Sequence, residues 1–277
     1  MTKERFVSST FGILVTTLAI FNDWLFIIVI MGLTIGGLYE FFYLIKKKGI
    51  PIYSYVGIFI GILLPASIYT RFELTKKWEL LFILVAFLLI LLMQFARKDN
   101  SNAVVGIATT LFGILYVSWF FSFLIKIRFI LPSPDGCASQ AGINLLGFII
   151  LVTKMGDIGA LLIGSRLGKH PLIPRISPNK SVEGCLGSFL FSTAAALVAK
   201  PLLPNIFSTI HVASLGAFFG GIGQLGDLSE SLIKRDCHVK DSGKLLPGMG
   251  GVLDIIDSLL FTAPAFYMYI SAALNSG

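Results

Sequence analysis

Long apolar runs, separated by short charged or turn-rich breaks, are the feature that most constrains how this chain can fold. Several runs approach the roughly 20 residues that an α-helix needs to cross the hydrocarbon core of a bilayer. Only 13% of the 277 residues are charged, whereas a soluble domain carries about 25%. The mean hydropathy of +0.85 agrees with this deficit. The pattern predicts an all-α polytopic integral membrane protein with about nine transmembrane helices.

The apolar runs also predict where these helices lie. The expected ranges are 8–21, 24–45, 53–70, 78–96, 103–125, 140–165, 183–199, 205–226 and 252–273. A positively charged start precedes the first run, as in a signal peptide, but no small-residue cleavage site follows it. We therefore expect a retained first helix.

Lysine and arginine are distributed unevenly between alternate loops, fifteen on one side against six on the other. Because basic residues favour the cytoplasmic side, this bias predicts a cytoplasmic N-terminus in a multi-pass protein of the cell inner or plasma membrane. The polar loops 166–182 and 227–251 then face the cytoplasm. Glu40 and Lys154 fall within predicted spans, where charge is costly, so we expect both to make structural polar contacts inside the bundle.

The cysteines and the net charge exclude two other kinds of site. Cys137, Cys185 and Cys237 are far apart and form no Cys-x-x-Cys pair, so we assign them no metal or redox role. The formal net charge is +7, but no stretch of interleaved basic and aromatic residues accompanies it. We attribute the charge to cytoplasmic loops and expect no nucleic acid polymer as a partner.

The segment GDLSESLIKR, residues 226–235, carries the first group of polar side chains. Asp227, Glu230, Ser231 and Lys234 follow helical spacing and share one face. Acids that lead into a basic pair suit a site holding a cation together with the phosphates that the cation bridges. A solvated helix end with an intrahelical ion pair explains the same spacing, and the sequence leaves both interpretations open.

A glycine-rich segment follows at residues 243–251 and breaks the helix. Its backbone N–H groups can approach an anion closely, and the N-terminus of the next helix also favours phosphate. Asp254 and Asp257 lie three residues apart just inside that helix and share a face. Because isolated carboxylates are expensive in a bilayer, we expect these two to bind a hard divalent cation such as Mg²⁺.

The third group of polar residues lies between residues 155 and 184. Asp157 is another acid within a predicted span, and several basic residues follow it. We interpret residues 177–181 as a turn whose hydroxyls, together with Lys180, bind the phosphates or base of a nucleotide. Ser181 is also suited to cap the next helix.

These three groups resemble the signature of the phosphatidate cytidylyltransferases (CDP-diacylglycerol synthases) over about residues 150–260. The family's C-terminal pattern is matched, with its spacing, by Ser231, Lys234-Arg235, Lys240-Asp241, Gly243, Pro247, Gly250-Gly251, Asp254 and Asp257. Its upstream segments are matched by Asp157-Ile158-Gly159-Ala160, Gly168-Lys169 and Ile176-Ser177-Pro178-Asn179-Lys180-Ser181-Val182-Glu183-Gly184.

Two positions depart from the family pattern. Met249 stands where the family has histidine, and Ile255 stands where it has arginine after the first acid of the last pair. Methionine cannot donate a hydrogen bond to phosphate, and isoleucine removes a cation. Either His238, Lys240 or Lys244 fills these roles, or the roles are dispensable for catalysis, or activity is lost.

The resemblance implies that CTP and phosphatidate react to give CDP-diacylglycerol and pyrophosphate, with Mg²⁺ at one or two cation positions. It implies Asp227 and Asp254 as Mg²⁺ ligands, with Asp257 and Asp157 in outer positions or at a second ion. The other catalytic residues would be Lys234, Arg235, Lys240 and Asp241, and the substrate-binding residues Ser177, Pro178, Lys180, Ser231, Gly250 and Gly251.

We expect one membrane domain over residues 1–277, with N-terminal helices in 1–135 and the catalytic helices and cytoplasmic loops in 138–277. The expected partners are CTP, phosphatidate, the lipid bilayer and a second copy of the chain in a homodimer. Two other functions stay open. One is a CTP-dependent polyprenol or lipid-alcohol kinase, because such kinases share related C-terminal segments. The other is a cation-coupled transporter, because acids beside broken helices also suit ion coupling.

Overall fold

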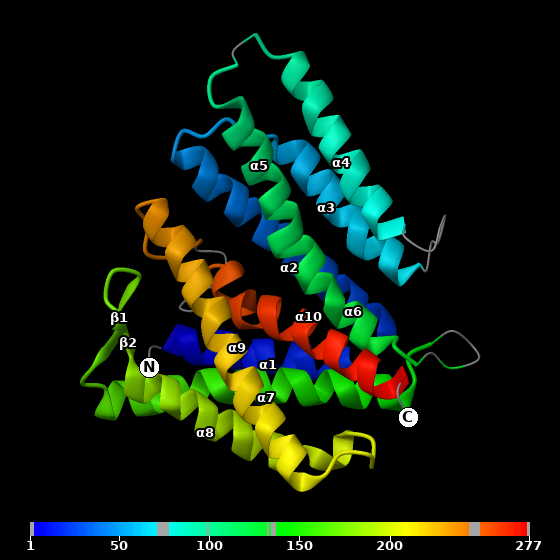
Figure 1. The fold of residues 1–277 in the computed structure, drawn as a ribbon, viewed down its shortest axis with the longest axis vertical. Coiled ribbons are helices and arrows are strands. Elements are labelled where there is room, and N and C mark those ends of the chain that lie inside the picture. Colours follow the sequence, from blue (N-terminus) through cyan, green and yellow to red (C-terminus); the bar gives the residue numbers. More distant parts are fainter. Residues whose placement is uncertain are drawn as a thin grey trace. The chain divides into compact units, whose positions relative to one another are not determined.

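The computed structural model describes residues 3–70, 78–98, 100–131, 133, 137–243 and 250–275. Its α-helices, labelled in Figure 1, overlap the nine predicted ranges, and a short 3-10 helix spans Lys200–Leu202, so the all-α class is confirmed for these residues. They are α1 (Lys3–Phe21), α2 (Asp23–Lys47), α3 (Ser54–Tyr69), α4 (Trp78–Phe95), α5 (Ala103–Gly113), α6 (Phe120–Arg128), α7 (Gln140–Leu167), α8 (Val182–Val198), α9 (Thr209–Asp236) and α10 (Leu253–Asn275). A π-helical stretch, Ile114–Trp119, joins α5 to α6.

Five helical segments in the described part of the chain are long and apolar enough to cross a membrane. They are α2, α4, the continuous α5–α6 segment, α7 and α10. Shorter apolar helices occur within α1 and at α3 and α8. The chain therefore has several candidate transmembrane helices, and the other four of the nine predicted spans stay predictions.

The chain divides into two compact units. The N-terminal unit comprises residues 1–125 and 236–255, and the C-terminal unit comprises residues 126–235 and 256–277. In the N-terminal unit, a buried cluster of side chains forms a core between α3, α4 and the π-helical stretch. Its members are Tyr53, Ile60, Ala86, Ile90 and Ile114.

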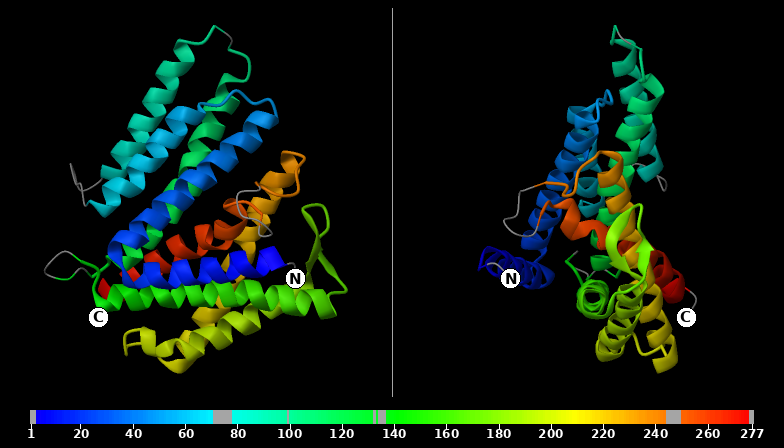
Figure 2. Two further views of the ribbon diagram at one scale, coloured as in Figure 1. Left: turned by 180° about the vertical axis from the view of Figure 1, so that it is seen from behind. Right: turned by 90° about the vertical axis from the view of Figure 1, so that its left-hand side faces the viewer.

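In the C-terminal unit, α7 and α8 run side by side (Figure 1, Figure 2). Ser139 caps α7 and Ser181 caps α8, each hydroxyl accepting a backbone N–H three residues ahead, so the predicted cap at Ser181 is confirmed. A Cβ atom on Gly159 would lie 2.5 Å from the carbonyl oxygen of Gly187. Glycine at these positions therefore lets the two helices approach closely, as small residues do in membrane bundles.

Two local features differ from the prediction. Residues 177–181 form a strand, β2 (Ser177–Ser181), which pairs antiparallel with β1 (Pro171–Ile173), instead of a simple turn. Helix α9 continues to Asp236, well beyond the predicted end at residue 226. The apolar run stops at residue 226, but the last turns of α9 still bury one face, so the helix continues to Asp236 as an amphipathic helix.

Candidate functional site

Three carboxylates converge in the C-terminal unit, and we call them the acidic triad: Asp227 and Glu230 of α9 and Asp257 of α10. One oxygen from each lies within 4.8 Å of the other two. Glu230 is 1% exposed and Asp257 is 7% exposed, whereas the Asp227 side chain is 31% exposed. The triad therefore has two buried members and one that reaches solvent.

The close approach of α9 and α10 positions the acidic triad. A Cβ atom on Gly226 would lie 2.4 Å from the carbonyl oxygen of Asp257. Only glycine allows the two backbones to come so near, and the approach occurs beside Asp227. The Asp257 carboxylate is further fixed by the backbone N–H of Ser258, which donates to its Oδ1 at 2.6 Å.

Two lysines pair with the acidic triad. Lys180 of β2 places its Nζ 2.7 Å from Asp227 Oδ2. Lys234, one turn along α9, places its Nζ 2.5 Å from Glu230 Oε2. The predicted intrahelical ion pair is therefore present, and it coexists with a cluster of acids from two helices. The spacing had left these as alternatives.

A second charged pair lies on α7. Lys154 Nζ is 3.0 Å from Asp157 Oδ2 and 3.1 Å from Ser258 Oγ, and Ser258 Oγ donates to Asp157 Oδ2 at 2.9 Å. Lys154 also interacts electrostatically with Asp227 and Asp257. The expectation that Lys154 makes a structural polar contact is confirmed, and this contact links Asp157 to the surroundings of the acidic triad.

The residues present fit a hard divalent cation. Mg²⁺ prefers oxygen ligands at about 2.0–2.1 Å, so opposite ligands lie about 4.2 Å apart. The spread of 4.8 Å in the acidic triad needs only a small closing movement of the side chains. Counted as formal charges, the triad with Asp157 carries four negative charges against three positive ones from Lys154, Lys180 and Lys234. A bound Mg²⁺ would offset the charge of the clustered carboxylates and would favour phosphate beside them.

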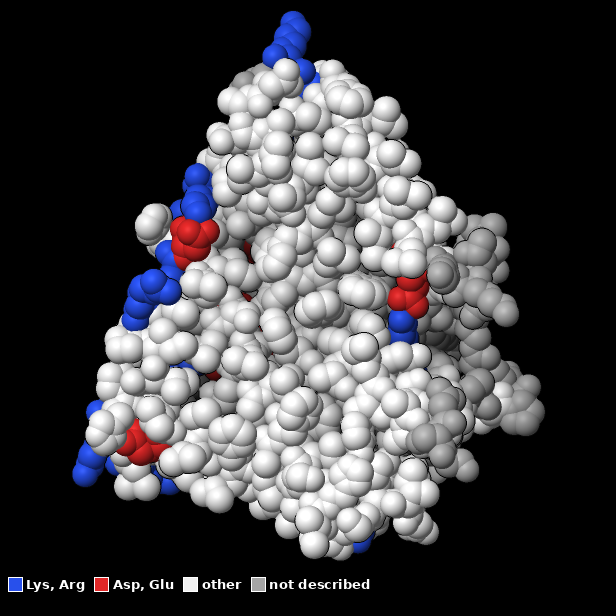
Figure 3. Space-filling model, viewed as in Figure 1, with Lys and Arg blue, Asp and Glu red and all other residues white. Residues whose placement is uncertain are grey.

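The β1–β2 hairpin lies against α9. Arg235 donates from Nε to the carbonyl oxygen of Ile176 at 3.2 Å, and Lys180 reaches Asp227 as described. The half-buried Ser177 and exposed Pro178 belong to β2. Most of the charged side chains visible in Figure 3 gather along one edge, over this hairpin and the neighbouring C-terminal part of α9.

Glu183, outside the five long apolar helices, closes the base of this hairpin. Its carboxylate accepts from the backbone N–H groups of Lys169 and His170 at 3.1 and 3.2 Å, and it pairs with the His170 ring at 2.6 Å. The hydrogen bond from His170, with help from backbone N–H groups, lowers the pKa of Glu183 to about 2. Glu183 therefore anchors the base of the hairpin that carries Lys180, while Arg235 holds its turn at Ile176.

The N-terminal unit holds the rest of the predicted site. The Oδ2 atom of Asp254 accepts from Gly251 N at 2.7 Å and from Ser242 N and Oγ at 3.3 and 2.9 Å. Gly250 adopts a φ of +98°, which favours glycine. Lys240 and Asp241 are exposed in a turn, while Pro247 and Met249 lie outside the described residues.

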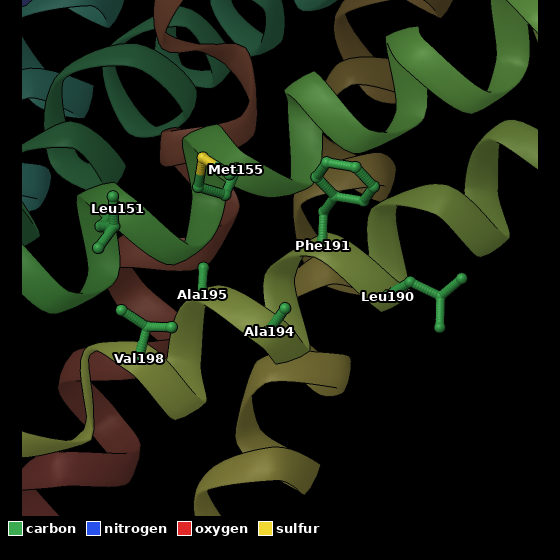
Figure 4. Close-up of a pocket in the computed structure, with 7 residues that line it drawn as sticks. All are labelled: Leu151, Met155, Leu190, Phe191, Ala194, Ala195 and Val198. Atoms are coloured by element: carbon green, nitrogen blue, oxygen red, sulfur yellow. The ribbon is translucent and has the colours of Figure 1, made fainter.

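An apolar groove of about 470 Å³ lies on the C-terminal unit. Figure 4 shows its walls, which come from α7 and α8. The lining residues are Leu151, Met155, Leu190, Phe191, Ala194, Ala195 and Val198. The groove contains none of the predicted polar site residues, but α7 also carries Lys154 and Asp157.

The structure therefore unites some predicted residues and adds others. Asp227, Asp257, Asp157, Lys180 and Lys234 gather in the C-terminal unit, while Ser231 is buried in α9 and Gly250, Gly251 and Asp254 belong to the other unit. Glu230 was not among the predicted metal ligands, although its spacing from Asp227 was visible. Ser258 and Ser242 gave no sequence signal as bridging residues, because their partners are distant in the chain.

Comparison with known proteins gives the family. The cytidylyltransferase family model matches residues 3–273. A phosphatidate cytidylyltransferase of Synechocystis sp. is 31% identical over 98% of this chain and 97% of its own length. A phosphatidate cytidylyltransferase of Bacillus subtilis is 32% identical over 97% of each chain.

A third relative has no assigned function. The uncharacterized protein YnbB of Escherichia coli is 38% identical over 60% of this chain, and the matching region spans 51% of YnbB. The full-length matches and the family model together support one assignment. The chain belongs to the cytidylyltransferase family and is homologous to phosphatidate cytidylyltransferases over nearly its full length.

Proposed function

We propose that this protein is a phosphatidate cytidylyltransferase, which converts CTP and phosphatidate to CDP-diacylglycerol and pyrophosphate. The observation that carries the proposal is the acidic triad with its paired lysines, found in a chain of the cytidylyltransferase family. Relatives that align with almost the whole chain bear this enzyme name, which supports a lipid phosphate as the acceptor.

The reaction joins two anions. A phosphate oxygen of phosphatidate attacks the α-phosphorus of CTP, and the bond from that phosphorus to the oxygen of the departing pyrophosphate breaks. The attacking group is already anionic, so the protein needs no strong base. Positioning and charge neutralisation are therefore the main tasks of the active site.

The acidic triad and the lysines share the task of charge neutralisation. Asp227, Glu230 and Asp257 would hold Mg²⁺, which would supply charge neutralisation for the phosphates of the reaction. Lys180 and Lys234 pair with two of these acids in the present structure. The ammonium groups of both lysines would bind phosphate oxygens beside these carboxylates.

The remaining predicted residues take supporting roles in the proposal. Asp254 serves a second cation or the glycine-rich segment, and Asp157 fixes Lys154 near the acidic triad. Arg235, Lys240 and Asp241 complete the charged surroundings of the phosphates. Ser177, Pro178 and Ser231 of the C-terminal unit would bind the nucleotide, and Gly250 and Gly251 of the N-terminal unit keep their expected role of offering backbone N–H groups to a phosphate.

We assign the apolar α7–α8 groove to an acyl chain of the lipid substrate. Its walls are apolar throughout, and Leu151 of the groove lies three residues before Lys154 on α7, so that the two are neighbours on the helix surface. A lipid could therefore lay its chain in the groove with its phosphate toward the charged residues. The proposed location is the cytoplasmic face of the inner or plasma membrane, where CTP is available, and a homodimer stays a prediction.

An assay with purified protein in detergent micelles tests the function. CTP, Mg²⁺ and a lipid panel of phosphatidate, diacylglycerol and polyprenol are supplied, and the lipid products are identified by mass spectrometry. We expect CDP-diacylglycerol from phosphatidate alone and no product without a divalent cation. Phosphorylated diacylglycerol or polyprenol would instead identify a kinase. Cation-driven solute uptake by proteoliposomes without CTP turnover would identify a transporter.

A further inference from the structure

Glu40 is a carboxylate in the middle of an apolar helix far from the signature region. It lies in the sequence LYEFFYL of α2 and is only 2% exposed. A buried acid in a candidate membrane span is costly unless it serves a specific contact. The surroundings of Glu40 within the N-terminal unit show which contact this is.

Glu40 binds the start of α10. Its Oε2 accepts a hydrogen bond from the backbone N–H of Leu253 at 3.0 Å. Leu253 is the first residue of α10, and the first N–H groups of a helix have no acceptor within the helix. Glu40 therefore caps α10 from another helix, and its negative charge suits the positive end of the α10 dipole.

The same oxygen of Glu40 reaches Asp254 through one serine. The hydroxyl of Ser242 lies between the two carboxylates, 3.0 Å from Glu40 Oε2 and 2.9 Å from Asp254 Oδ2, and donates its single proton to one of them at a time. Ser242 is buried, so no solvent competes for this bridge. The orientation of the Asp254 carboxylate is thereby tied to a residue of the N-terminal helices.

Glu40 also packs directly against the glycine-rich backbone. A Cβ atom on Gly243 would lie 2.1 Å from Glu40 Oε1, and one on Gly251 would lie 2.4 Å from Glu40 Oε2. The backbone thus passes the carboxylate closely on both sides. The structure gives Oε1 no hydrogen-bond partner among the described residues, although leaving a buried oxygen unsatisfied is costly. Capping of α10 uses only Oε2, so it does not explain why a charged carboxylate with a second buried oxygen stands at this position.

We infer that Glu40 is a positioning residue for nucleotidyl transfer, holding Asp254 and the Gly250–Gly251 backbone in the geometry that receives the phosphates. This inference rests on the proposed function. Glu40 acts through Ser242 and through the N-terminus of α10, and it does not contact substrate. The plain N-terminal helices thereby contribute directly to the arrangement of the signature segment.

The test compares Glu40→Gln with Glu79→Gln as a matched control. Glu79 is also a glutamate of an N-terminal apolar helix, and it accepts a hydrogen bond from Trp119 Nε1 at 2.9 Å, away from the glycine-rich segment. For each variant, kcat, KM for CTP, the Mg²⁺ dependence and the thermal unfolding temperature are measured. We expect Glu40→Gln to lower kcat about 10–100-fold and, because the family resemblance implies Asp254 as a Mg²⁺ ligand, to raise the Mg²⁺ requirement, as loss of an outer partner of a metal ligand does.

The other variants separate positioning from folding. Glu40→Asp keeps the charge and should recover part of the lost kcat, while Glu79→Gln should match the wild type. If Glu40→Gln does not fold, Ser242→Ala decides, because it removes the bridge to Asp254 but leaves the cap on α10. Folded Glu40→Gln or, failing that, folded Ser242→Ala with wild-type kcat and Mg²⁺ dependence would overturn the inference.

A lipid-independent measurement separates this inference from the proposed function. Binding of Mg²⁺ with CTP should raise the thermal unfolding temperature of the wild type and of Glu79→Gln, and the shift should be much smaller for Glu40→Gln. A wild type that makes no CDP-diacylglycerol contradicts the proposed function, while the comparison of thermal shifts still decides the role of Glu40. Equal shifts in all three proteins would refute that role.

Discussion

The three acids of the acidic triad differ in burial, and this difference suggests different tasks. Glu230 and Asp257 are almost fully buried, so a cation held by them is shielded from competing water. Asp227 is partly exposed and pairs with Lys180 from another element. Because Asp227 is the exposed member, we expect it to be the one that an incoming phosphate approaches.

Replacing one buried acid should remove most activity. Asp257→Asn keeps the size of the side chain but removes a charge and an anionic ligand. We expect CDP-diacylglycerol formation to fall at least about 100-fold, because losing even an outer partner of a metal ligand costs about 10–100-fold. Rates measured across a range of Mg²⁺ concentrations check this.

Asp236→Asn is the matched control, because it removes a carboxylate at the exposed end of α9 that pairs with Lys48. It should keep wild-type rates. Near-normal turnover of Asp257→Asn at saturating Mg²⁺ would remove Asp257 from the metal site.

At the residue scale, the sequence allowed the acids to be predicted better than their partners. Asp227 and Glu230 were placed on one helix face by their spacing, and Asp257 was conspicuous as an acid in an apolar helix. The grouping of Asp257 with the other two was not predicted, because it depends on how α9 packs against α10. Glu40 was expected to make a structural contact inside the bundle, and its contacts bear this out. Its partners Ser242 and Leu253 lie 202 and 213 residues further along the chain, and the spacing of nearby residues cannot reveal contacts over such a distance in sequence.

At the scale of elements, the apolar runs were enough to place the helices but not their ends. The final turns of α9 lie beyond the predicted span 205–226 and within the predicted polar loop 227–251, although the spacing of residues 226–235 had already indicated a helix. The β1–β2 hairpin was missed because its strands are short and include proline and asparagine, which rarely mark strands. The end of α9 and the β1–β2 hairpin are both stabilised by tertiary contacts, such as that of Arg235 with Ile176, which local sequence does not reveal.

The contact between α9 and α10 gives a prediction at this scale. Gly226→Ala places a methyl group where the Asp257 carbonyl oxygen lies. We expect a loss of stability of about 1–3 kcal/mol, as for other overpacked sites, together with reduced turnover because the acidic triad is spread. Thermal unfolding and activity measured on the same preparation test both effects.

Gly223→Ala is the matched control on the same helix. The nearest atom to its Cβ would be Thr262 Cγ2 at 3.7 Å, an ordinary contact distance. It should preserve both stability and turnover. Equal behaviour of the two variants would contradict the view that helix approach at Gly226 builds the site.

The α7–α8 groove gives a second prediction at this scale. Ala194→Trp should fill part of the groove and raise KM for long-chain phosphatidate several-fold, since the indole ring occupies space that the acyl chain would otherwise contact. Turnover of a short-chain phosphatidate should change little. Leu186→Trp, which alters an exposed residue of α8 outside the groove, is the control. If Ala194→Trp affects all chain lengths alike, the groove does not bind the acyl chain.

At the scale of the whole molecule, the family model matches residues 3–273, whereas the signature motifs that were recognised in the sequence lie only within about residues 150–260. The first half shows its relation to the family in apolar runs that any membrane bundle could share. Physical constraint explains this difference: lipid-facing positions accept many apolar side chains, while a metal and phosphate site accepts few. Glu40 is the exception in that first half, and it contacts the signature segment.

The orientation predicted from lysine and arginine can be tested with a natural probe. Cys137 is exposed and falls in a loop predicted to lie outside. A membrane-impermeant maleimide should label it in intact cells, and Cys137→Ser should remove that label. In the Cys137→Ser background, His170→Cys should be labelled only after the cells are permeabilised. The reverse pattern would show that the N-terminus lies outside.

The central claim is that the α-phosphorus of CTP is transferred to a lipid phosphate. It is tested most directly by supplying purified protein with phosphatidate, Mg²⁺ and CTP carrying distinguishable labels at the α- and γ-phosphorus. The account predicts the α label in CDP-diacylglycerol and the γ label in pyrophosphate. The appearance of the γ label in lipid would contradict it.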